Sequence, residues 1–268
     1  MYNKLLRTAT LPYKTIRGSY ELRQQKAASF TRKIMSEIDG QVDEGGISLS
    51  KFGRKIKKNL PQNLSFYVDK NRDKSSYAQL SVLYDGKERA CEYEFSIELG
   101  KTGKIDVSHL PVIVHEVTHL SDYLFHPKTL ARSQQIKQST INLSKYYDFY
   151  DKEVYIREKI DKNNTKENVL KRIRKKTKIF MAGWPIKDRI NILQDMRYSL
   201  ISERNAYKKQ YKMAKKLHRK NTAVDKDFLE DDTKIYMFDE KIELLKQMTL
   251  RFINWERKQN RNLINVGT

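Results

Sequence analysis

The sequence is poor in the residues that mark secreted, fibrous or membrane proteins. It has one cysteine, five prolines and ten glycines in 268 residues, and a single thiol excludes a disulfide within the chain. The run LPVIV at 110–114 is among its longest apolar stretches, far short of a signal-peptide core or a membrane span. We therefore expect no membrane span and no secretion signal, and a protein that is cytoplasmic or packaged in a particle.

Charge of one sign is in excess. The chain has 54 lysines and arginines against 33 aspartates and glutamates, a formal net charge of +21. Such an excess favours anionic partners, namely nucleic acid, acidic proteins or anionic lipid. A basic surface without a dedicated polyanion site is the alternative. The hydrophobic content of 38% is enough to bury a core.

The first half of the chain changes from helical to alternating periodicity. Residues 19–38 and 49–60 have apolar positions at helical spacing, whereas three later segments alternate apolar and polar residues. The segment CEYEFSIEL places Cys91 among core-facing residues, so we interpret this cysteine as packing. With Asp-Gly at 85–86 as a hairpin turn, a small, mostly antiparallel sheet is predicted from strands at 64–68, 77–85 and 91–99.

From residue 108 onward the pattern is helical almost to the end. The first of these helices carries Pro111 in its first turn, has Ser108 as a possible cap, and should end before Pro127. The sequence thus predicts an α+β fold in which a small sheet packs on this helix and a largely helical half follows. The later helices are expected at 130–161, 165–180, 184–217 and 233–258.

The motif HEVTH lies in the first of these helices. Residues four apart on a helix lie one above the other, so His115 and His119 can face one ion. Glu116 lies beside them, where a general base would stand. An ordinary amphipathic helix with a polar face is the alternative. However, the helix is apolar on most sides except along the histidine stripe, which favours an internal polar site.

A catalytic zinc ion needs a third protein ligand. His126 lies two turns beyond His119, too far along the helix to share its ion. Asp122 follows His119 by three residues, and we assign it to orienting a ligating histidine; a surface carboxylate is the alternative. Glu203 is the preferred third ligand, because it stands where the apolar stripe of helix 184–217 demands an apolar residue. A pairing with a nearby lysine or arginine is the alternative for Glu203.

HEVTH followed by the later E-R-N-A-Y resembles the gluzincin branch of the zincin metallopeptidases, whose pattern is HExxH plus a glutamate on a downstream helix. The resemblance covers roughly residues 60–210. It implies a zincin-like catalytic domain at 60–218 with a helical insertion at about 130–183, preceded by a helical extension at 1–59. Residues 219–268 are then a C-terminal helix that packs on this domain.

The resemblance also implies an activity and its residues. Zinc held by His115, His119 and Glu203 would serve a peptide hydrolase, with Glu116 as the general base for water and a polypeptide as the substrate. Tyr207 is the candidate that stabilises the oxyanion, with a core tyrosine as the alternative. Strand 91–99 is a candidate peptide-binding edge, and a solvated outer face is its alternative.

Two basic runs suggest a further partner. Residues 166–180 carry seven lysines and arginines against one glutamate, and residues 204–220 carry eight and no acid. Both are candidates for binding nucleic acid or an acidic protein, with a solvated helix face as the alternative. The competing hypothesis for the whole chain is therefore a non-catalytic, basic, nucleic-acid-associated or structural protein on a zincin scaffold, held in a larger assembly.

Overall fold

The computed structural model describes residues 20–40, 46–60, 65–70, 77–84, 90–125, 143–155, 164–220 and 222–266. These residues form two compact units. The first comprises the described residues of Met1–Ala131 and Asn205–Asp232, and the second those of Arg132–Arg204 and Thr233–Thr268. Helix α8 (Ile186–His218) is unbroken and contributes to both units. The predicted domain boundaries stay a prediction.

Two helices open the first unit where the sequence predicted them. They are α2 (Tyr20–Asp39) and α3 (Leu49–Asn59). The Ser48 hydroxyl caps α3 by accepting a hydrogen bond from the Lys51 amide at 3.3 Å, which satisfies one of the free N–H groups of the first turn. Phe52 and Ile56, one turn apart on α3, are buried in the core.

A three-stranded mixed sheet follows, in the order β1-β3-β2. Strand β3 pairs antiparallel with β2, as predicted, but parallel with β1, so the expected mostly antiparallel sheet is only partly correct. Alternation reveals which face of a strand is buried but not which neighbour it pairs with. The Asp-Gly turn at 85–86 lies outside the described residues. The strands span β1 (Ser65–Lys70), β2 (Ala78–Tyr84) and β3 (Ala90–Ile97).

The inner face of β3 is as the alternation predicted. Tyr93, Phe95 and Ile97 are fully buried, and the Phe95 ring meets Phe52 of α3 edge-on with centroids 5.5 Å apart. The prediction that strand 91–99 is a peptide-binding edge is wrong, because β3 is the central strand and has a neighbour on both sides. The edges of this sheet are β1 and β2. The burial of Cys91 lies outside what the structure describes.

Helix α4 (Leu110–Phe125) carries HEVTH and ends before Pro127, as predicted. It continues from a 3₁₀ turn at Val107–His109, and the cap of that turn is Asp106 rather than the expected Ser108. The Asp106 carboxylate accepts hydrogen bonds from the Ser108 amide and hydroxyl, which hold its pKa below the usual value. An acidic side chain outcompetes a hydroxyl for this role because it accepts both bonds at once.

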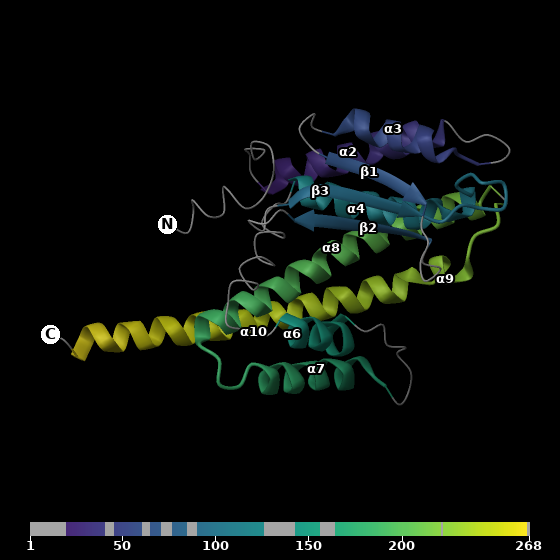
Figure 1. The fold of residues 1–268 in the computed structure, drawn as a ribbon. Helices are drawn as coiled ribbons and strands as arrows, with labels where there is room; N and C mark the ends of the chain where they lie inside the picture. Colours follow the sequence, from purple (N-terminus) through teal and green to yellow (C-terminus); the bar gives the residue numbers. More distant parts are fainter. Residues whose placement is uncertain are drawn as a thin grey trace. The chain divides into compact units, whose positions relative to one another are not determined.

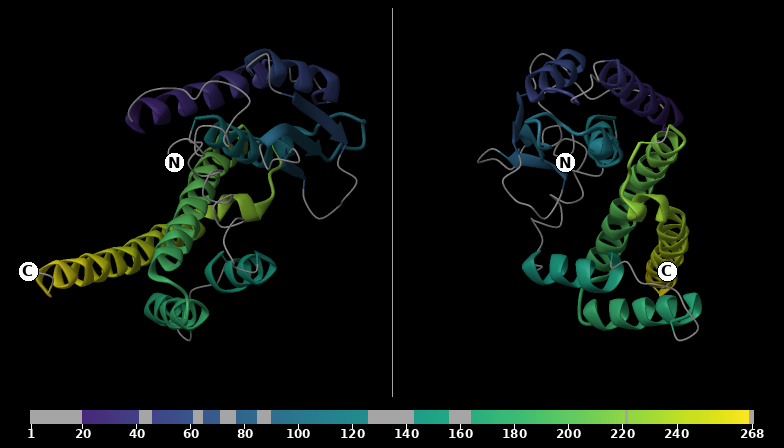
Figure 2. Two further views of the ribbon diagram at one scale, coloured as in Figure 1. Left: turned by 60° about the vertical axis from the view of Figure 1, so that its left-hand side comes forward. Right: turned by 90° about the vertical axis from the view of Figure 1, so that its right-hand side faces the viewer.

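The apolar face of α4 packs within the first unit. The predicted stripe is buried, and the Ser121 hydroxyl donates to the backbone oxygen of Ala27 in α2 at 2.9 Å. Phe125 of α4 meets Phe30 of α2 with ring centroids 5.6 Å apart. Figures 1 and 2 show α2, α3 and α4 gathered beside the sheet. The buried stripe residues are Ile113, Val117, Leu120 and Leu124.

The regular elements in the described part of the second unit are all helical. The helix expected at 130–161 is described only over 143–155, where α6 (Leu143–Phe149) passes into a π-helical turn, η2 (Tyr150–Tyr155). Helix α7 (Lys166–Phe180) matches its prediction and lies beside α6 (Figures 1 and 2). The rings of Phe149 and Phe180 are stacked with centroids 4.1 Å apart.

Helix α10 (Asp231–Val266) is longer than the predicted 233–258. Phe238, Leu245 and Met248 on one face of this helix are buried, whereas half of the surface of Trp255, farther along the helix, is exposed. Among the described residues, no helix combines the length and apolar character that a bilayer crossing requires. A four-residue helix, α9 (Lys226–Leu229), precedes α10.

Candidate metal centre

Two buried histidines lie side by side on α4. His115 and His119 are one helical turn apart and are 7% and 9% exposed. Their Nε2 atoms are 3.0 Å apart, and their rings meet at 71° with centroids separated by 4.8 Å. The spacing of HEVTH predicted this arrangement, in which two imidazoles on a largely apolar helix face the same point.

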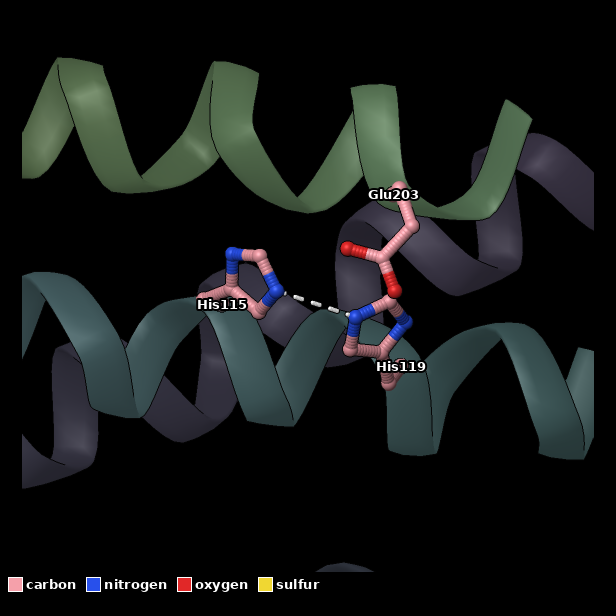
Figure 3. A group of neighbouring side chains, drawn as sticks. All are labelled: His115, His119 and Glu203. Atoms are coloured by element: carbon pink, nitrogen blue, oxygen red, sulfur yellow. Dashed lines mark hydrogen bonds between the residues drawn. The ribbon is translucent and has the colours of Figure 1, made fainter. Parts of the chain in front are cut away.

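Glu203 of α8 completes a group of three. One ligand atom from each of His115, His119 and Glu203 lies within 4.8 Å of the others, and Figure 3 shows the carboxylate of α8 directed at the two rings of α4. The division between the units falls within α8, after Arg204, so Glu203 belongs to the second unit. Tyr207, one turn later on the same unbroken helix, belongs to the first. The predicted convergence of these three side chains is therefore observed.

The apolar register of α8 explains why Glu203 is there. Leu200 and Tyr207, one turn before and one turn after, are buried, so the intervening carboxylate is carried on the inward face. Ala206 is fully buried and has no side chain beyond Cβ to hold the helix away from its neighbours. Glu203 itself is half-buried.

Tyr155 contacts the carboxylate of Glu203 from the π-helical turn η2. Its hydroxyl donates a hydrogen bond to Glu203 Oε2 at 3.4 Å. The sequence did not predict a role for Tyr155, because a π-helical turn shifts the register of side chains by a residue and the helical pattern at 130–161 gave no sign of such a turn. The only available signal was the density of tyrosines in YYDFYDKEVY, residues 146–155.

Burial and the negative charge of Glu203 both raise the pKa values of two neighbouring groups, Tyr150 and Asp151. The pKa of Tyr150 lies well above its usual value, first because its phenol is buried and then because of the Glu203 carboxylate. The pKa of Asp151 is raised too, by desolvation, by Asp148 and by Glu203. A cation beside Glu203 would offset this accumulation of negative charge.

Tyr207 packs against the histidine pair. It is 2% exposed, and its ring meets that of His115 edge-on at 79°, with centroids 4.7 Å apart. The ring thus packs directly against His115. Its predicted role at the oxyanion stays a prediction.

Glu116 faces the sheet rather than the histidine pair. It is half-buried, and its carboxylate accepts a hydrogen bond from the Leu80 amide of β2 at 3.0 Å. The backbone amide of Glu98 donates to the backbone oxygen of Tyr77, so these two residues face each other as a hydrogen-bonded pair. Hydrogen-bonded and non-hydrogen-bonded pairs alternate along an antiparallel ladder. The amide of Leu80, which lies opposite Phe95, therefore points away from β3 and toward the outer edge of the sheet. Glu116 therefore lies at the outer edge of β2.

Asp122 is the last acidic residue of the predicted set. It is 8% exposed and lies on α4 three residues after His119, so it is buried as an orienting carboxylate would be. This position removes the alternative of a surface carboxylate, while its role toward the histidines stays a prediction. His126 lies outside the described residues.

The donor set fits a zinc ion. Two imidazole nitrogens and one carboxylate oxygen are donors that zinc accepts in catalytic sites, with a fourth position left for water. Ligands about 2.1 Å from one ion in a tetrahedron are about 3.4 Å apart, close to the observed 3.0 Å between the two nitrogens.

Comparison of the chain with protein-family models, curated proteins and solved structures finds no match. The site thus has to be interpreted from its own geometry.

Proposed function

We propose that the protein is a zinc-dependent metallopeptidase with a zincin-like catalytic domain. The observation that carries the proposal is the convergence of His115, His119 and Glu203, which come from two helices far apart in sequence. A partly buried carboxylate beside two buried imidazoles is stabilised by a shared cation. The gluzincin resemblance of HEVTH and E-R-N-A-Y supports the same ligand set.

Each residue then has a chemical task. Zinc, when bound, supplies Lewis acidity that acidifies water and polarises a peptide carbonyl. Glu116 takes the proton from the attacking water and passes it to the leaving amine. Glu116 follows His115 directly in the sequence, and we propose that a change of side-chain rotamer moves its carboxylate from the Leu80 amide toward the zinc-bound water. Tyr207 is proposed to stabilise the oxyanion.

The substrate is proposed to be an extended polypeptide on the outer edge of β2. The Leu80 amide, now bonded to Glu116, points outward and becomes a donor for a substrate carbonyl when Glu116 turns toward the zinc. This assignment replaces strand β3, whose two neighbours leave it no free edge.

A non-catalytic protein on the same scaffold is the second candidate. Its support is the charge of +21, which favours an assembly with a polyanion. Such a protein has no use for Glu116, whereas the peptidase requires it.

The proposal is tested by zinc content and cleavage measured together. Native mass spectrometry should find one zinc ion per chain, and an unfolded protein substrate should be cleaved, with cleavage lost on chelation and restored by zinc. The Glu203→Ala variant should lose zinc and cleavage, whereas Glu230→Ala, an exposed glutamate between α9 and α10, should keep both. Zinc binding without cleavage of any peptide would favour the second candidate, and absence of zinc would overturn both the metal site and the peptidase.

A further inference from the structure

We propose that the C-terminal end of α8 binds the phosphate backbone of nucleic acid. Five cationic side chains line a concave surface there, with a volume of about 410 Å³. We call these five residues the terminal basic surface. The proposal does not depend on the peptidase function. The surface consists of Lys212, Lys215, Lys216, Arg219 and Lys220.

The spacing of these residues builds a charged strip rather than a scattered surface. Positions 212, 215, 216 and 219 are three or four residues apart, so they share one face of the helix. From Lys212 to Lys220 the strip extends about 12 Å, at about 1.5 Å per residue. All five side chains are exposed, whereas Ala214 and Leu217 of the same turns are buried in the first unit.

The strip is short of neutralising acids. Lys216 is paired with Asp39 of α2. Among the described residues, Lys212, Arg219 and Lys220 form no ion pair, and residues 204–220 contain no acid. The pKa of Lys209 is lowered, first by burial and then by the charges of Lys212 and Arg32 of α2. Positive charge from two helices therefore accumulates here.

The other basic helix differs in this respect. On α7, Arg172 and Lys176 pair with Glu153 of η2, and Lys166 pairs with Glu240 of α10. These acids belong to the same unit as α7 and offset part of its charge. The two runs are similarly rich in lysine and arginine but differ in their acidic partners, and the terminal basic surface is the stronger candidate for an external polyanion.

The chemistry of the surface favours nucleic acid over a membrane. A helix that lies on a bilayer inserts large apolar side chains, and no large hydrophobic residue of 205–220 is exposed. The apolar side of this segment faces the protein core instead. An acidic protein partner is also disfavoured, because protein interfaces are centred on apolar or aromatic anchors. Tyr211, the nearest aromatic residue, is covered by the ammonium of Lys215 at 4.3 Å from its ring.

Binding of this kind is driven by release of counterions and does not read sequence. Each phosphate that a lysine neutralises adds about 0.9 to the slope of log affinity against log salt concentration for duplex DNA. The surface should therefore bind duplexes of any sequence, with an affinity that falls steeply as salt is raised.

The test uses two triple variants with the same charge change. Lys212→Gln/Lys215→Gln/Lys220→Gln alters the terminal basic surface, and Lys171→Gln/Lys175→Gln/Lys178→Gln alters exposed lysines of α7. Binding of a labelled duplex of about 20 base pairs is measured by fluorescence anisotropy from about 50 to about 200 mM salt. The α8 variant should reduce the salt slope by about 2 to 3, and the α7 variant should leave it within about 1 of the wild-type value.

Three results would overturn the proposal. They are absence of duplex binding by the wild-type protein, equal losses in the two variants, and stronger binding to phosphatidylserine vesicles that the α8 variant alone abolishes. The triple Lys→Arg variant at 212, 215 and 220 keeps the charge and should keep the slope. If this Lys→Arg variant lost the wild-type salt slope while its melting temperature stayed unchanged, the proposal would also be contradicted.

Discussion

Helix α8 carries two charged regions that differ in the sign of their charge, in their burial and in their neighbours. At Glu203 a single carboxylate interrupts a buried apolar stripe and lies beside two histidines. Beyond Lys212 a group of cations is exposed on the same helix, and its apolar side is buried. A half-buried carboxylate beside two buried imidazoles is favoured by a shared cation, so Glu203 points to a ligand by its position together with the two histidines. A surface charge is inexpensive, so the terminal basic surface acquires meaning from the shortage of acids around it: of its five cations, Lys216 pairs with Asp39, and Lys212, Arg219 and Lys220 form no ion pair with the residues that the structure describes.

The largest effect is expected at the buried region. His119→Ala removes one of two imidazoles and should weaken zinc binding by more than about 100-fold, the upper end for residues that only orient a ligand. Competition with a fluorescent zinc chelator measures the change. The matched control is His218→Ala, since His218 is an exposed histidine near the end of α8 and should not alter zinc affinity. Equal zinc affinity in the two variants would remove the contrast between the regions.

The next effect separates metal binding from catalysis. Glu116→Gln should keep one zinc ion per chain but lower kcat by about 100- to 10,000-fold, because the amide cannot accept the proton of water. The variant retains a carbonyl oxygen that accepts the Leu80 amide, so the fold around β2 should be unchanged. Unaltered cleavage with zinc retained would exclude Glu116 as the base.

A third test compares a buried cation with an exposed one. Lys241 of α10 donates to the Val154 oxygen at 2.7 Å, and burial, aided by the charge of Arg172, lowers its pKa to about 8. The unfolded chain, in which the lysine pKa is 10.5, binds the proton more tightly, so stability rises as the pH increases from about 8 toward 10.5.

Relative to Lys241→Met, the wild-type free energy of unfolding should therefore gain about 2 kcal/mol between pH 7 and about 9.5, measured by urea denaturation. The same comparison with Lys258→Met, at an exposed position of α10, should show no pH-dependent difference. A flat difference for Lys241 would show that its ammonium is solvated.

The smallest effect concerns the residue that touches Glu203. Tyr155→Phe removes the hydroxyl that donates to Glu203 Oε2 and should weaken zinc binding by about 10-fold. Tyr236→Phe, at an exposed tyrosine of α10, is the control. A purely structural role would lower thermal stability without altering zinc affinity at a temperature where both variants are folded.

The sequence predicted the grouping of His115, His119 and Glu203 because helical periodicity decides which faces of α4 and α8 carry them. The interval between His115 and His119 and the apolar register around Glu203 are local properties of two helices, and both are observed. The α+β class and the antiparallel pair of strands were predicted for the same reason.

What the sequence could not predict depends on contacts between elements. The position of β3 between β1 and β2 follows from strand pairing, which the alternation of one strand does not encode. Tyr155 reaches Glu203 only because a π-helical turn changes its direction. The acids that pair with α7 lie in η2 and α10, so the difference between the two basic runs is invisible in composition.

The most direct test of the metal centre is the position of zinc in a crystal of the protein, located by anomalous scattering at the zinc edge. We predict one peak about 2.0 to 2.2 Å from a ring nitrogen of His115, a ring nitrogen of His119 and a carboxylate oxygen of Glu203. A peak bound elsewhere, or Glu203 turned away from the two imidazoles with zinc present, would contradict the account.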